Sequence, residues 1–217
     1  MDTYVARYFD AHGAEDTTIT NDGTTLRMTL RDVEFAGTDF DSLEPNDAAT
    51  QDQLAKFTLN HNELCSCRIE CEVPIPINDH GSQSQGTLFV DLTVGDPEPK
   101  GWLDLEVLRL RLTTKHGEFV GSGKSGWFED ELLEIQSQLP EAVYMQACIN
   151  CLYSDYSPYG HGAFGYMICF RNLKSEYLAV KSKDDFWAVH NCYDRIVQET
   201  FVYPEFACRV PGTGYRG

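Results

Sequence analysis

Cysteines in the second half of the chain have the residue type and spacing that a metal site requires. Cys148 and Cys151 form a Cys-x-x-Cys pair, in which two thiolates of one tight turn can bind a single ion. Structural zinc takes four such ligands in a tetrahedron, and Cys169 is the natural third because the chain returns through it after a loop. The fourth ligand has three candidates, Cys192, Cys208 and His161. We take Cys192 with the first three as the expected set, and zinc is the cofactor that this set predicts.

The same segment allows other interpretations. Cys151, Asp155 and His161 lie within one loop region, and a cysteine beside a histidine is a recognised nucleophilic arrangement. A small metal-dependent or cysteine-dependent enzyme that uses residues 148–169 is therefore an alternative function. A redox Cys-x-x-Cys is disfavoured, because the pair lies where a strand passes into a loop rather than at a helix N-terminus that lowers a thiol pKa. Buried thiols without a chemical role would also fit the pattern.

Aromatic and polar side chains are unusually dense between the two expected strands. Aromatic residues concentrate at protein interfaces, so this loop is a candidate binding surface. Its expected binding residues are Tyr153, Asp155, Tyr156, Tyr159, His161 and Phe164. The alternative is that these rings cover the core.

A second group of cysteines has a structural explanation. From residue 65 to residue 77 the odd positions are cysteine, isoleucine or valine and the even positions are mainly polar or proline, which is the period of a strand with one buried face. We therefore expect Cys65, Cys67 and Cys71 to be small core side chains. Two prolines, Pro74 and Pro76, suggest that this strand ends at a sheet edge.

The rest of the chain predicts a β-rich fold. Residues 1–125 consist almost entirely of short alternating runs, including two around Asn21-Asp22-Gly23 that predict a hairpin. Residues 127–139 predict the one principal helix, because their apolar positions share one face and Pro140 stops it. Further along, we expect strands at 164–170 and 176–180 that pair as a hairpin, and a short helix at 184–190 capped by Asp184.

The charge is strongly acidic and unevenly distributed. The formal net charge is −17, and residues 1–60 carry 12 Asp and Glu against 4 Arg and Lys. Nucleic acid is not an expected partner, because phosphate binding needs clustered Lys and Arg. An acidic surface can instead receive a basic protein, although it can also serve only solubility. The first residues do not resemble a signal peptide and no stretch has the length of a membrane span, so we expect a cytoplasmic protein with reduced thiols and no membrane partner.

Several motifs resemble those of an uncharacterised bacterial family. They are TITNDGTTL, GWFEDELLEIQSQLP, ACINC, SDYSPYGHGAFGYMICFR, VQET followed by PEF, and PGTGYRG at the end. The resemblance implies a single cytosolic bacterial domain and assigns no catalytic residue. It also implies a further cysteine just before Pro-Glu-Phe, where this chain has Tyr203, so a four-cysteine site here would need Cys192 or Cys208 in its place.

These observations define one set of expectations. The fold class is α+β and β-rich, with antiparallel, sandwich-like sheets and one principal helix. Residues 1–217 form a single domain, with a finer division into a β-sheet part at 1–125 and a helix plus cysteine-containing β part at 126–217. The expected function is that of an acidic bacterial binding protein, an immunity-type inhibitor that neutralises a basic toxin. The chain is not expected to be an enzyme.

Overall fold

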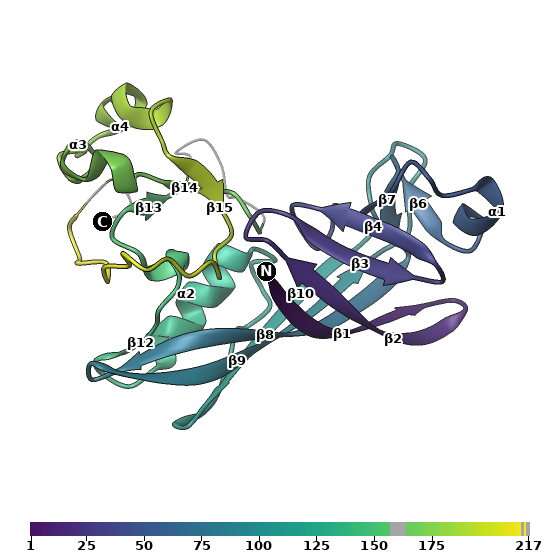
Figure 1. Ribbon diagram of the computed structural model, residues 1–217, viewed down its shortest axis with the longest axis horizontal. Helices are drawn as coiled ribbons and strands as arrows, with labels where there is room; N and C mark the ends of the chain where they lie inside the picture. Colours follow the sequence, from purple (N-terminus) through teal and green to yellow (C-terminus); the bar gives the residue numbers. More distant parts are fainter. Residues whose placement is uncertain (157–163, 214, 216–217) are drawn as a thin grey trace. The chain divides into compact units, whose positions relative to one another are not determined.

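The computed structural model describes residues 1–156, 164–213 and 215, and the chain divides into two compact units (Figure 1). Unit 1 comprises Met1–Pro74 and Thr87–Gly126, and unit 2 comprises Ile75–Gly86 and Trp127–Gly217. The last division point along the chain, at 126/127, lies one residue after the one expected at 125/126. Unit 2 also takes the tip of a long hairpin, which the sequence did not indicate.

Unit 1 consists mainly of antiparallel strands that follow the order β11-β10-β9-β8-β1-β2-β3-β4-β5 in one sheet. The bounds are β1 Asp2–Asp10, β2 Gly13–Asn21, β3 Leu26–Leu30, β4 Val33–Gly37, β5 Glu44–Pro45, β8 Cys67–Asp79, β9 Ser82–Val94, β10 Glu106–Thr114 and β11 Gly117–Val120. A separate hairpin is formed by β6 Thr58–Asn60 and β7 Glu63–Cys65, and a single helical turn, α1, spans Gln51–Leu54.

The predicted hairpin around Asp22 is confirmed as β2–β3. The Asp22 carboxylate accepts hydrogen bonds from the backbone N–H groups of Thr24 and Thr25 at 2.9 and 2.8 Å, which closes the turn. Gly23 has a φ of +97°, a left-handed conformation that favours glycine. Along β3 every second residue is buried, as the alternation of the sequence predicts.

Strand β8 lies between β9 and β1, and the cysteines at 65–71 are core residues as predicted. Cys67 and Cys71 are buried on the same face of β8 as its isoleucines and valines, and Cys65 is buried at the end of β7. The inference from the prolines was wrong, because β8 continues through both of them to Asp79. It pairs with β1 over residues 68–72 and with β12 (Val143–Met145) over residues 77–79, so Pro74 lies between the two paired stretches and Pro76 borders the second, where its carbonyl accepts from Gln146 N at 2.8 Å.

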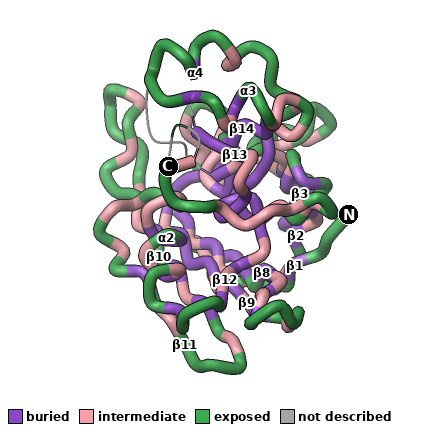
Figure 2. Tube along the Cα trace, turned by 90° about the vertical axis from the view of Figure 1, so that its left-hand side faces the viewer, coloured by how far each residue is buried: buried purple, intermediate pink, exposed green. Residues whose placement is uncertain are grey.

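Unit 2 contains the helices and the remaining short strands. The bounds are α2 Phe128–Gln138, β12 Val143–Met145, the 3₁₀ turn η1 Cys148–Asn150, β13 Ser154–Asp155, β14 Met167–Cys169, the 3₁₀ turn η2 Arg171–Leu173, α3 Lys174–Leu178, α4 Lys183–His190 and β15 Arg195–Val197. The buried cluster beside the helices α3 and α4 contains Ile168, Phe170, Tyr177, Val180 and Phe186. Helix α4 is otherwise mostly exposed, with Phe186 as its buried residue (Figure 2).

The principal helix is confirmed as α2, whereas two local predictions in unit 2 were wrong. The expected strand at 176–180 is mostly the helix α3, because Tyr177 and Val180 reach the same buried cluster at a helical rather than a strand spacing. The cap of α4 is Ser182, whose hydroxyl accepts from Asp185 N at 3.2 Å, and not Asp184. The fold class itself is confirmed as β-rich, with antiparallel sheets and few helices. In the part of the chain that is described, no helix is long and apolar enough to cross a membrane.

Candidate functional site

A three-stranded antiparallel sheet, in the order β13-β14-β15, positions most of the residues that the sequence predicts as metal ligands or binding residues. Ser154 faces Cys169 across β13 and β14, and Met167 faces Val197 across β14 and β15. The Ser154 hydroxyl donates to the backbone carbonyl of Cys148 at 2.5 Å, which ties the turn η1 to the sheet. Residues distant in the sequence are thereby gathered in the interior of unit 2.

Three of the four expected metal ligands are interior, and the fourth is not. Cys148, Cys151 and Cys169 are buried, whereas Cys192 is exposed beyond the end of α4. The cysteine paired with Cys151 is Cys208, which lies opposite it in an isolated antiparallel bridge. Among residues 1–156, 164–213 and 215, no group of three or more His, Cys, Asp and Glu side chains has an arrangement that could hold a metal ion. Zinc binding therefore gains no support from the described residues.

The thiols of Cys148 and Cys169 are kept in their protonated form by their surroundings. Burial raises the pKa of Cys148 well above its ordinary value, and the neighbouring positions of Cys151 and Cys169 raise it further. Burial also raises the pKa of Cys169, with a partly opposing backbone hydrogen bond from Arg171. A nucleophilic cysteine needs a lowered pKa, so these environments argue against Cys148 or Cys169 as a catalytic thiolate.

Glu199 is a fully buried carboxyl group that connects two parts of unit 2. Its side chain accepts a hydrogen bond from the Tyr156 hydroxyl at 2.6 Å and one from the backbone N–H of Gly165 at 2.7 Å. Burial raises the pKa of Glu199 to about 7, because the hydrogen bonds compensate only part of the lost hydration, and the charge of Glu129 adds to the effect. Glu199 is therefore present in both its protonated and its ionised form near neutral pH.

A second buried carboxylate, Asp155, accepts a hydrogen bond from Tyr177, and Arg209 binds the backbone beside it. The Tyr177 hydroxyl donates to Asp155 Oδ2 at 2.6 Å. Burial raises the pKa of Tyr177, and the negative charge of Asp155 is the next cause. Arg209 Nη2 donates to the carbonyls of Cys151, at 3.1 Å, and of Ser154. Through its Nη2 atom Arg209 holds the C-terminal segment against these carbonyls, whereas its Nε and Nη1 atoms are buried without a hydrogen-bond partner among the described residues.

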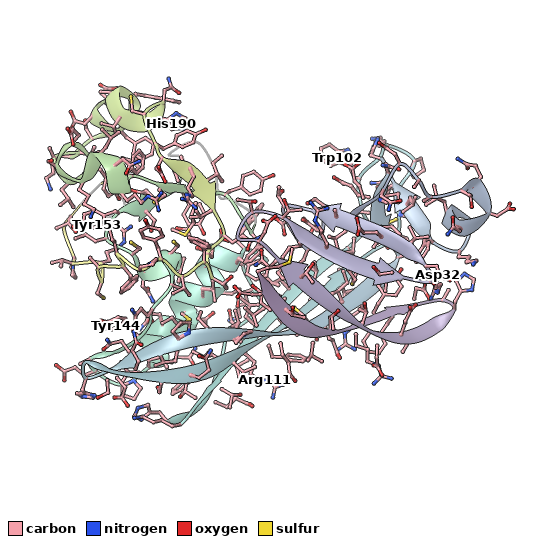
Figure 3. The ribbon with its side chains drawn as sticks, viewed as in Figure 1. Asp32, Trp102, Arg111, Tyr144, Tyr153 and His190 are labelled. Carbon is pink, nitrogen blue, oxygen red and sulfur yellow. The ribbon has the colours of Figure 1, made fainter. Side chains whose placement is uncertain are left out.

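The residues expected to form an aromatic binding surface are mostly interior. Asp155, Tyr156 and Phe164 are 2%, 5% and 1% exposed, so in this structure they are core side chains. Tyr153 is half-buried, with Lys174 Nζ 5.0 Å from the centre of its ring (Figure 3). Tyr159 and His161 lie outside the described residues. The binding role of this set stays a prediction.

Unit 1 has an exposed group of residues that sequence reasoning did not single out. Trp102 is 72% exposed and Leu105 is 49% exposed, both in the segment between β9 and β10. This segment is braced against the β6–β7 hairpin, since Asn60 Nδ2 donates to Gly101 O at 3.0 Å (Figure 3). His61 lies so close to Gly101 that a Cβ there would be 2.3 Å from its Nε2. The position of Trp102 is therefore fixed by glycine packing and by an amide hydrogen bond.

Carboxylates with raised pKa values lie next to this segment. Burial raises the pKa of Asp41, and loss of hydration together with the charge of Asp41 raises the pKa values of both Glu63 and Glu106. Glu44 is a further cause for Glu63, and His61 opposes it. Mutual effects of this kind require that the carboxylates be close together. We call the following residues the acidic face: Asp41, Glu44, Glu63, Trp102, Leu105 and Glu106.

Sequence signals could have identified Trp102 but not Glu199. Trp102 stands among Asp96, Glu98 and Asp104 in a segment rich in proline and glycine, and an exposed aromatic residue in an acidic loop is a recognisable binding signal. Glu199 gave no such signal, because a carboxylate in a polar run is normally exposed and its burial depends on tertiary packing.

Comparisons with known proteins give one match. The model of a family of unknown function (DUF6304) matches residues 2–154, which is more than half of the chain. The matched range contains the acidic face, Cys148 and Cys151, and it ends before Asp155 and Glu199. Searches of characterised proteins and of solved structures gave no match.

Proposed function

The chain belongs to the family of unknown function DUF6304, and on that premise we propose that it is an acidic binding protein that receives a basic protein partner on unit 1. The expected biological form is an immunity-type inhibitor that neutralises a basic toxin. The family carries no activity that could be transferred, so the proposal is based on the residues of this chain alone.

The exposed Trp102 is the single observation that carries the proposal. A tryptophan that is 72% exposed on a braced segment leaves a large apolar surface in water. Tryptophan is among the residues that contribute most to binding energy, especially when a ring of polar residues surrounds it. The segment that carries Trp102 is acidic, because four Asp and Glu but only one Lys occur between residues 95 and 106. An apolar anchor with an acidic rim fits a partner with an apolar pocket among Lys and Arg side chains.

The charge of the acidic face supports the same class of partner. Unit 1 carries 21 Asp and Glu against 10 Arg and Lys, a formal net charge of −11. Within the face, lost hydration raises the pKa values of Asp41, Glu63 and Glu106, and repulsion from Asp41 adds to the effect at Glu63 and Glu106. A partner's Lys or Arg would remove the repulsion and steer association, so the complex would gain in both affinity and rate.

Affinity capture with matched variants tests the proposal. The protein is immobilised and exposed to lysate of its source cell, and captured proteins are identified by mass spectrometry. We expect a basic protein whose binding weakens by roughly 30-fold or more in Trp102→Ala, which is the loss typical of a central tryptophan. The double variant Glu63→Gln/Glu106→Gln should weaken binding most at low salt, because salt screens exposed charges.

Two comparisons distinguish the acidic face from general acidity. The control Asp2→Asn/Glu118→Gln removes the same net charge from the exposed positions of β1 and β11, and it should bind nearly as well as the natural protein. If both double variants lose the same affinity, or if Trp102→Ala binds normally, the face is not the binding site. If the captured protein is not toxic when expressed alone, or if co-expression of this chain does not restore growth, the inhibitor role is refuted.

A further inference from the structure

Cys151 and Cys208 lie directly opposite each other in an antiparallel bridge within unit 2. The hydrogen bonds around the pair run from Leu152 N to Ala207 O, at 2.7 Å, and from Arg209 N to Asn150 O, at 2.8 Å. The two cysteines exchange no backbone hydrogen bond themselves, so they occupy a non-hydrogen-bonded position. Residues in such positions have Cα atoms about 4.5 Å apart and closely spaced side chains.

That geometry matches what a disulfide requires. Cysteines joined by a disulfide have Cα atoms about 4.4–6.8 Å apart, so the bridge already has a suitable separation. Burial raises the pKa of Cys208, and the position of Cys151 across the bridge raises it further, as expected for a close pair. Both thiols are free in the structure.

Further contacts hold the segment of Cys208 in place. Arg209 Nη2 donates to the carbonyl of Cys151, and the ring of Phe206 stacks on Tyr144 with centroids 6.0 Å apart. Side-chain contacts therefore fix the chain on both sides of Cys208, at Phe206 before it and at Arg209 after it. The thiol pair does not need a rearrangement of the backbone in order to react.

We propose that Cys151 and Cys208 form a redox modification site, in which a low-molecular-weight disulfide such as oxidised glutathione converts the two thiols into a cross-strand disulfide. The thiolate of Cys208 attacks one sulfur of the reagent, which gives a mixed disulfide and releases one thiolate. The thiolate of Cys151 then attacks the Cys208 sulfur and releases the second. The two cysteines lose two electrons and two protons, and the reagent is reduced to two thiols.

The environments of the two thiols fix the order and the rate of these steps. Cys208 is partly exposed whereas Cys151 is buried, so the reagent reaches Cys208 first. Burial raises the pKa of Cys208, so its thiolate is scarce at neutral pH and exchange is slow. Because the surroundings do not stabilise the Cys208 thiolate of the reduced form, the disulfide, once formed, resists reduction.

Tryptic mapping tests the cross-link. The protein is incubated with oxidised glutathione, quenched with acid, blocked with N-ethylmaleimide and digested. Cys148, Cys151 and Cys169 all fall in peptide 125–171, and Cys208 falls in peptide 196–209. We expect these two peptides to be joined, with a rate that rises about tenfold per pH unit below the Cys208 pKa. The oxidised protein should melt roughly 5–15 °C higher than the reduced one.

Serine variants identify the partner of Cys208. Cys151→Ser and Cys208→Ser should abolish the joined peptides, whereas Cys148→Ser, Cys169→Ser and Cys192→Ser should retain them. Circular dichroism of each variant, and a Cys208→Ala variant beside Cys208→Ser, exclude loss by misfolding. The proposal is overturned if the joined peptides persist in Cys151→Ser or if glutathione stays on Cys208 as a mixed disulfide. It is also overturned if the purified protein holds about one zinc ion per chain that blocks the reaction.

Discussion

Replacing Glu199 with glutamine should stabilise unit 2 at neutral and alkaline pH. The folded protein raises the pKa of this carboxyl group from 4.5 to about 7. Each pKa unit corresponds to about 1.36 kcal/mol, so an ionised Glu199 costs the folded state about 3 kcal/mol. Glutamine has no such cost, and it can keep both contacts, with its carbonyl accepting from Gly165 N–H and its amide donating to the Tyr156 oxygen.

The direction in which the free energy of unfolding changes with pH follows from the protons bound in the folded and unfolded states. Below about pH 4.5 Glu199 is protonated in both the folded and the unfolded protein, so it adds no pH dependence. Between about pH 4.5 and 7 only the unfolded protein loses this proton, so the free energy of unfolding falls as the pH rises. Above about pH 7 the full cost is present. The stability of Glu199→Gln relative to the natural protein should therefore rise by about 3 kcal/mol across this window.

Urea unfolding at several pH values measures this difference. In a Trp102→Phe background the two remaining tryptophans, Trp127 and Trp187, both lie in unit 2 and report its unfolding. Glu176→Gln, an exposed glutamate of α3, is the matched control and should show no comparable pH dependence relative to its parent. A relative stability of Glu199→Gln that stays constant with pH, within about 0.5 kcal/mol, would falsify the assignment of a raised pKa to Glu199.

Three further substitutions probe other contacts. Tyr177→Phe removes the donor to Asp155 and should lower the free energy of unfolding of unit 2 by about 1–3 kcal/mol, measured with the same tryptophans; no loss would mean that water replaces the hydroxyl. Gly37→Ala would place a Cβ 2.3 Å from the backbone oxygen of Ser42, so the fluorescence of the tryptophan in unit 1 should report unfolding at lower urea, and an unchanged midpoint would refute the close approach. Ser182→Ala removes the cap of α4 and should cost about 1 kcal/mol, whereas Ser182→Thr, which keeps a hydroxyl to accept from Asp185 N and to donate to its carboxylate, should recover most of it.

Local patterns predicted the parts of the fold that depend on local chemistry. The alternation at 65–77 identified β8 and its buried cysteines, and the apolar spacing at 127–139 identified α2, because burial of one face sets each period. The error at Pro74 and Pro76 has a physical origin. A proline excludes a hydrogen bond only on one edge of a strand, and the sequence does not show that β1 and β12 share that edge without overlapping.

The candidate sites depended more on tertiary packing. The sequence grouped Cys148, Cys151 and Cys169 as metal ligands, and the structure buries all three, but no motif around Cys192 or Cys208 indicates which of them lies opposite Cys151. Asp155 was selected as a binding residue from its loop context, whereas its burial depends on Tyr177 from a helix that was read as a strand. A carboxylate acquires an unusual pKa from its neighbours in space, and a single sequence does not list them.

The proline-containing stretch of β8 has a consequence for how the chain tolerates change. β1 pairs with residues 68–72 and β12 with residues 77–79, and neither Pro74 nor Pro76 has an N–H group through which a ladder could continue between them. A slip of one residue reverses which side chains face inward, and slips normally propagate along a continuous ladder. Here the alignment of β1 with β8 is independent of the alignment of β12 with β8. An insertion in the β1–β2 hairpin can therefore be absorbed without shifting β12, which leaves the two halves of one strand free to diverge independently during evolution.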